Sequence, residues 1–256
     1  MLRIIITCVF TTVFYFNCHA QITPPGMGKA NTASWFAIGV QQDLNNERTI
    51  HSETYFGLGR ISNPDTYNLV QKQSLYVLNE EVSHHFKKNW QYSVAVSYRS
   101  QSKYQSTSPY ELDVPKYRQE VRLYTRFDYI NTFKKINYSI SYRPELRFFY
   151  NPNFSSSTEN TQFRSRFRGK TTVNINSLKT HKIIATAEAL FSTSRTNDWS
   201  KFEYKEARFC LYYSVILPVQ KVTLNLGYMH NIIGKFSSSP VHYLAFDIVV
   251  KNPFKR

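Results

Sequence analysis

The sequence predicts an all-β fold, namely a single antiparallel transmembrane β-barrel of about 12 strands, with about 10 as the fallback. Three observations predict it. Apolar and polar residues alternate along most of the chain, aromatic residues make up 16% of it, and the mean hydropathy is nevertheless polar, at −0.42. Strands with one face toward lipid and the other toward a polar interior produce this combination.

The first residues predict export. Met1-Leu2-Arg3 is a short basic start, residues 4–16 are almost wholly apolar, and Cys18-His19-Ala20 ends on a small residue. This order is typical of a secretory signal peptide. The apolar run is too short for a membrane-spanning helix, which needs roughly 20 residues. We therefore expect cleavage after Ala20.

These expectations divide the chain into three parts. Residues 1–20 form the signal peptide, residues 21–33 form an extended lead-in that could lie partly in the lumen, and residues 34–256 form the barrel domain. After cleavage the chain retains a single cysteine, Cys210. A single thiol cannot form an internal disulfide, so this is not a disulfide-stapled fold.

The alternation is clearest in residues 90–99. Trp90, Tyr92, Val94, Val96 and Tyr98 share one face, and polar or small residues share the other. Aromatic residues at both ends of an apolar face, with valines between them, are typical of a lipid-facing strand with interfacial aromatic girdles.

Similar alternation predicts ten further strands, at residues 35–42, 49–60, 72–85, 117–129, 136–147, 163–175, 183–193, 206–215, 221–231 and 241–250. The pattern therefore yields eleven strands. Because single-chain bacterial barrels have an even number of strands, we expect about 12.

The connections alternate in length. Short turns are expected at residues 45–46, 87–89, 132–135, 177–180 and 217–220, and longer polar loops at 61–68, 100–115, 150–161, 194–200 and 234–240. Short periplasmic turns and longer extracellular loops are typical of outer-membrane barrels. A soluble β-sandwich, as in a periplasmic binding protein, or a lipocalin-like barrel is the alternative fold, because the strands of both also alternate, with the apolar face inward.

Charged residues gather on the polar faces of the predicted strands, so we expect them in the lumen. The candidate lumen residues are Arg118, Glu120, Arg122, Arg126, Arg143, Glu145, Arg147, Arg164, Arg166, Arg168, Lys170, Glu188, Glu206 and Arg208.

Three interpretations of these charges stay open. Glutamates and arginines of neighbouring strands could pair across the interior and plug the barrel. The run from Arg164 to Lys170 has no acidic neighbour on its own strand, so a narrow passive channel with a basic, anion-favouring lumen is the second interpretation. Basic residues above the membrane could instead hold lipopolysaccharide phosphates.

The mature chain resembles the family named domain of unknown function 2490, a group of outer-membrane barrels. The resemblance rests on Trp35, the run Asn46-Glu47-Arg48, the alternating charges that begin at Arg118, Arg143 and Arg164, and the late Gly227-Tyr228 pair. It implies a barrel in the outer membrane of a Gram-negative bacterium and implies no reaction.

No catalytic motif emerges, so we expect no enzyme activity; a lipid-modifying enzyme without a recognised motif is the alternative. His84-His85 beside Glu80-Glu81 predicts no metal site, because adjacent residues on a strand point to opposite faces. We expect no cofactor and no metal, and a monomer whose partners are outer-membrane lipids, with lipopolysaccharide or small anionic solutes as further candidates. The net charge of +15 could favour nucleic acid, but export excludes that partner.

Overall fold

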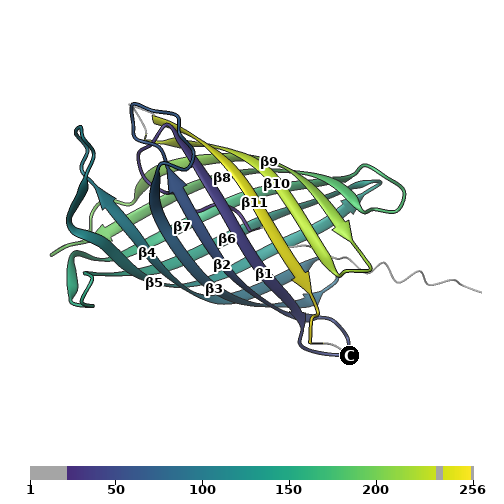
Figure 1. Ribbon diagram of the computed structural model, residues 1–256. Coiled ribbons are helices and arrows are strands. Elements are labelled where there is room, and N and C mark those ends of the chain that lie inside the picture. The colour runs from purple at the N-terminus through teal and green to yellow at the C-terminus, as the bar shows by residue number, and fades with distance from the viewer. Residues whose placement is uncertain (1–21, 235–238, 255–256) are drawn as a thin grey trace, which may run out of the picture.

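The computed structural model describes residues 22–234 and 239–254, and within these ranges the chain forms one closed β-barrel of eleven strands (Figure 1). The strands are β1 (Thr32–Asp43), β2 (Ile50–Ile61), β3 (Lys72–Lys87), β4 (Trp90–Tyr104), β5 (Leu112–Phe133), β6 (Ile136–Tyr150), β7 (Ser156–Asn174), β8 (His181–Arg195), β9 (Glu203–Leu217), β10 (Val222–Ile233) and β11 (Ser239–Lys251). The predicted signal peptide, residues 1–20, lies outside the described residues.

The expected strand number of 12, the fallback of 10 and the expected all-antiparallel pairing are wrong. In the described chain each strand pairs antiparallel with the next, but β1 pairs parallel with β11, from Thr32 opposite His242 to Gln41 opposite Lys251. An odd number of alternating strands leaves the first and last running in the same direction, so the closing pair has to be parallel. The alternation pattern had yielded eleven segments, and the even-number rule introduced the error.

The parallel seam between β1 and β11 is held at both ends by bonds outside the ladder. At one end the Asn252 amide N–H donates to the Gln41 carbonyl at 2.7 Å, and the Asp43 amide N–H donates to Asn252 Oδ1 at 2.7 Å. At the other end the His242 amide N–H donates to the Asn31 carbonyl at 3.0 Å. The residues that flank the two strands therefore lengthen the seam.

Successive connections lie at opposite ends of the barrel. The short-turn end carries residues 44–49, 88–89, 134–135, 175–180 and 218–221, and the long-loop end carries residues 62–71, 105–111, 151–155, 196–202 and Gly234. The expected loops 100–115 and 150–161 are shorter than predicted. Strand pairing continues into both: Tyr104 pairs with Leu112 and Tyr150 with Ser156, and the β4–β5 hairpin projects beyond its neighbours (Figure 1).

Strands β4 to β9 point an apolar face outward and a largely polar face inward. On β4, Trp90 and Val94 are 46% and 53% exposed, whereas Ser93 and Arg99 are 0% and 3% exposed. A soluble barrel or sandwich has the opposite arrangement, with its apolar face inside. The sheet also closes on itself, so the alternative two-sheet sandwich is wrong.

The described residues contain no helix that is long and apolar enough to cross a membrane.

Candidate functional site

The barrel interior brings together the groups that could bind or transport a ligand. Its wall has two different sides. Strands β1, β2, β3, β10 and β11 contribute mostly apolar side chains such as Trp35, Leu75, Met229 and Tyr243. Strands β4 to β9 contribute most of the buried arginines and glutamates.

Residues 22–31, named here the plug segment, lie inside the barrel against the apolar wall. Ile22 and Met27 are each 2% exposed. The Met27 amide N–H donates to Tyr243 Oη at 3.1 Å, and Arg99 Nη2 donates to the Gly26 carbonyl at 3.1 Å. Because Tyr243 lies on β11 and Arg99 on β4, these bonds tie the segment to both walls of the lumen.

Glycines on the inner face make room for the large apolar side chains. A Cβ on Gly59 would lie 2.6 Å from Met27 Sδ, and a Cβ on Gly227 would lie 2.2 Å from Tyr212 Cδ1. The close approach of these groups therefore requires residues without a side chain. Gly227, one of the residues on which the family resemblance rests, therefore has a packing role beside Tyr212.

Glu145 is the centre of the charged wall, and its side chain is fully buried. Arg143 Nε lies 2.7 Å and Arg166 Nη1 lies 2.9 Å from Glu145 Oε1, and Arg122 Nη1 lies 3.4 Å from Oε2. The three arginines come from β5, β6 and β7. One buried carboxylate thus joins three adjacent strands, and the several cations offset its desolvation.

Glu120 and Glu188 extend this ionic network around the wall. Glu120 accepts a hydrogen bond from Arg122 Nη2 at 2.7 Å and one from Arg147 Nη2 at 2.8 Å. Glu188 accepts from Arg166 Nη2 at 2.6 Å and from Arg168 Nε at 2.9 Å. The network therefore extends without interruption from β5 to β8.

Glu206 on β9 carries the network to the edge of the apolar wall. Arg208 Nη2 donates to Glu206 Oε1 at 2.7 Å, and the Asn231 side-chain amide donates to Oε2 at 3.0 Å. Arg164 Nη1 lies 3.7 Å from the same carboxylate. Glu206 thus connects β7, β9 and β10.

Most candidate lumen residues meet in this network, and three are placed differently. Arg118 lies nearer the long-loop end, 3.2 Å from Glu159, and Arg126 bonds to Glu81 at 2.9 Å. Lys170 lines a cavity at the short-turn end. Arg164, Arg166 and Arg168 lie on β7, whose Glu159 faces Arg118. The glutamates that face these three arginines come from β6, β8 and β9.

Several interior residues are not among the sequence candidates. Arg99, on the polar face of β4, lies 3.6 Å from Glu120, and Glu81 on β3 accepts hydrogen bonds from Ser93 and Tyr124 as well as from Arg126. The alternating pattern could have found both. The plug segment has no periodic pattern, so nothing in its sequence reveals that Met27 is buried.

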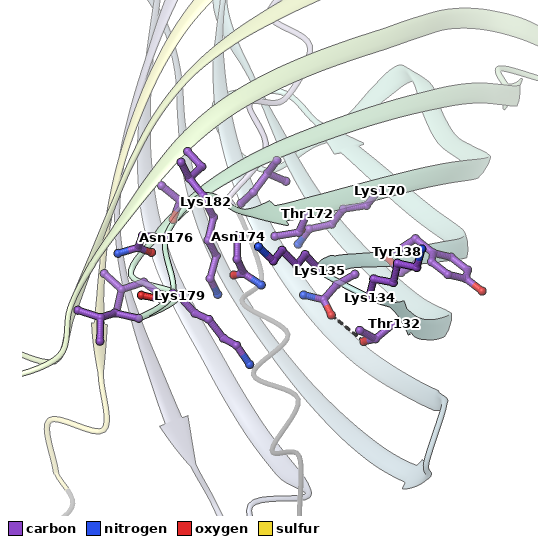
Figure 2. Close-up of a pocket in the computed structure, with 18 of the residues that line it drawn as sticks. Thr132, Lys134, Lys135, Tyr138, Lys170, Thr172, Asn174, Asn176, Lys179 and Lys182 are labelled. Atoms are coloured by element: carbon purple, nitrogen blue, oxygen red, sulfur yellow. Dashed lines mark hydrogen bonds between the residues drawn. The ribbon is translucent and has the colours of Figure 1, made fainter.

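The interior includes two cavities that described residues line. The first, of about 40 Å³, lies between the plug segment and the network and is lined by Ile22, Glu53, Tyr55 and Arg143 among others. It has room for only a few water molecules. The second, of about 600 Å³, opens at the short-turn end (Figure 2).

Among the described residues no group of three or more His, Cys, Asp or Glu side chains is placed to hold a metal ion. Glu80 and Glu81 diverge as expected for strand neighbours. Glu80 accepts a hydrogen bond from Ser52 Oγ at 2.5 Å, whereas Glu81 Oε2 accepts one from Arg126 Nη2 at 2.9 Å. Cys210 is a buried free thiol.

Comparison with known proteins gives one match. A family model described as "Protein of unknown function (DUF2490)" matches residues 32–241, which is almost the whole barrel. No curated protein and no solved structure matches the chain.

Proposed function

This chain belongs to the DUF2490 family, and we propose that it is a non-enzymatic outer-membrane barrel of a Gram-negative bacterium whose lumen is closed from within. Its direct partners are the lipids around it, and it acts as a monomer.

The apolar outer surface carries the membrane proposal. On β4 the outward side chains run from Trp90 through Val94 and Val96 to Tyr98, and each is at least 37% exposed. Equivalent side chains on neighbouring strands include Phe127, Ile140, Phe167, Leu211, Leu226 and Leu244. A contiguous apolar band around a whole barrel is unstable in water but matches a lipid layer.

The interior contacts support closure. The plug segment is hydrogen-bonded to β11 and β4, and each buried glutamate of the charged wall is paired with two or more arginines. A solute moving along the barrel would have to displace buried ion pairs, each of which is costly to break. The same pairing argues against free catalytic groups in this part of the lumen.

Labelling of single cysteines on cells tests the location. Ser155→Cys lies in the connection 151–155 at the long-loop end, and Ser177→Cys lies in the connection 175–180 at the short-turn end. We expect a membrane-impermeant maleimide to label Ser155→Cys on intact cells and Ser177→Cys only after the outer membrane is permeabilised. The parent chain, with buried Cys210, is the background control. Labelling of both, or of neither, on intact cells would contradict the proposal.

Planar-bilayer conductance tests the closure. The refolded mature chain, shown to be folded by heat-modifiable migration on a gel, should insert without steady current steps. Steady anion-selective steps from the intact chain would show an open basic pore and overturn the closed-lumen proposal.

A further inference from the structure

The cavity at the short-turn end differs in character from the rest of the lumen. It is named here the basic vestibule and is defined by Lys134, Lys135, Lys170, Lys179 and Lys182, which line a space of about 600 Å³. These lysines come from β7, β8 and the two turns that join β5 to β6 and β7 to β8. Figure 2 shows Lys179 and Lys182 with their amines turned to the same side as the Asn174 amide.

The lining of the vestibule carries charge of one sign. No aspartate or glutamate is among its described lining residues, although Glu53 and Asp128 lie outside this lining within electrostatic reach of Lys170. The arginines deeper in the lumen face glutamates at 2.6–2.9 Å. Lys182 lines this cavity and is only 9% exposed. A concave site lined by one sign of charge concentrates ions of the opposite sign.

The rim of the barrel at this end carries further basic residues, although Arg48 stands next to Glu47 and lies 3.6 Å from Asp43. Each of the four other connections or strand ends here carries a basic residue, namely Arg48, Lys88, Lys221 and Lys251. The rim would therefore attract an anion toward the vestibule before it binds there.

The neutral lining residues define what kind of anion fits. The side-chain amides of Asn137 and Asn174 and the hydroxyl of Thr172 stand among the lysines. Ammonium groups with amide and hydroxyl donors suit a ligand that presents many charged oxygen atoms, as phosphate groups do. The volume is in the range of small-molecule sites, and the apolar Ile175, Leu178 and Ile184 give it a partly apolar wall.

We propose that the basic vestibule is a binding site for a small anion that carries two or more linked phosphate groups, entering from the short-turn end. The site does not require an open lumen or a surrounding membrane. Its failure would therefore be distinguishable from failure of the barrel's proposed location and closure.

Isothermal titration of inorganic pyrophosphate into the refolded mature chain, in magnesium-free buffer at low ionic strength, tests the proposal. The test variant is Lys134→Gln/Lys135→Gln/Lys179→Gln, since these three exposed turn residues can change without disturbing the ionic network. The matched control is Lys87→Gln/Lys88→Gln/Lys221→Gln, which removes the same number of basic charges from the β3–β4 and β9–β10 turns at the same end of the barrel but outside the vestibule.

We expect the intact chain and the control to bind pyrophosphate similarly and the test variant to bind it about tenfold more weakly or not at all, since the variant removes three of the five ammonium groups that define the vestibule. A second arm titrates micelles of a short-chain diacylglycerol pyrophosphate, whose headgroup carries the same two linked phosphate groups. Binding of pyrophosphate identifies a soluble source of the phosphate, and binding of the micelles alone identifies a lipid headgroup.

Two outcomes would overturn the proposal. One is that neither probe binds the folded chain. The other is that the control weakens binding as much as the test variant, because the attraction would then belong to the whole basic rim and not to the vestibule.

Discussion

The indole ring of Trp35 occupies the space above Gly57, where any side chain would begin. A Cβ at residue 57 would lie 2.1 Å from Trp35 Cη2 and 2.3 Å from Cζ2. Trp35 is 2% exposed and lies on β1, next to the β2 strand that carries Gly57. The close approach of ring and backbone therefore fixes the packing of the apolar wall beside the seam.

Substitution Gly57→Ala should consequently destabilise the barrel. The methyl group cannot be accommodated unless the indole moves, and overpacking of this kind costs about 1–3 kcal/mol. Urea unfolding in detergent or lipid measures the change in the free energy of unfolding. Gly169→Ala is the matched control, because a Cβ there meets nothing within 4 Å. Equal stability of the two variants would contradict the packing described for Trp35.

Substitution Glu145→Gln should be more damaging than any surface ion-pair substitution. It removes the charge shared by Arg122, Arg143 and Arg166, and breaking a buried ionic group in this way costs about 3–5 kcal/mol. Glu203→Gln is the control, since Glu203 and Lys205 pair on the exposed surface, where a pair is worth about 0–1 kcal/mol. The same unfolding measurement applies. A loss for Glu145→Gln no larger than for Glu203→Gln would mean that the network does not stabilise the wall.

Substitution Tyr243→Phe should loosen the plug segment without opening the strand ladder. It removes the acceptor of the Met27 amide N–H and leaves that buried donor unsatisfied. Hydrogen exchange measured by mass spectrometry should become faster in residues 22–31 and remain unchanged in β4. Tyr67→Phe, at an exposed position in the connection 62–71, serves as the control and should change neither. Unaltered exchange in the segment would show that this bond does not anchor it.

Tryptophan fluorescence can locate the lipid-facing surface directly. Trp90 lies on the outer face near the short-turn end, against Tyr129 with ring centroids 5.2 Å apart, whereas Trp35 is inside the barrel. In bilayers that contain brominated lipids we expect the tryptophan fluorescence of the parent chain to be quenched. Most of this quenching should disappear in Trp90→Phe, whereas Trp199→Phe should be quenched like the parent. Trp199 is the control because it lies in the connection 196–202 at the long-loop end. Absence of quenching in the parent would contradict insertion in lipid.

The sequence determined the strands and their faces. Alternation at a period of two residues identifies each of the eleven segments. Side chains of a strand alternate between its two faces, and the outer and inner faces of this barrel differ in polarity. Trp90, Val94 and Tyr98 could thus be placed together on the outside, and Glu120, Arg122 and Glu145 on a shared polar face, without coordinates. The strand ends could not be placed, because pairing between β4 and β5 continues into residues that have the composition of a loop.

The tertiary structure alone decided how the barrel closes and what fills it. The parallel pairing of β1 with β11 joins opposite ends of the chain, and no local pattern encodes it. The partners of Arg166 are likewise invisible on β7, because Glu145 and Glu188 come from the strands on either side. The position of Met27 in the lumen depends on Gly59 and Tyr243, which are far away in the sequence. Local alternation reports which side of a sheet a residue faces, whereas contacts between distant strands depend on register and closure, which only the folded chain defines.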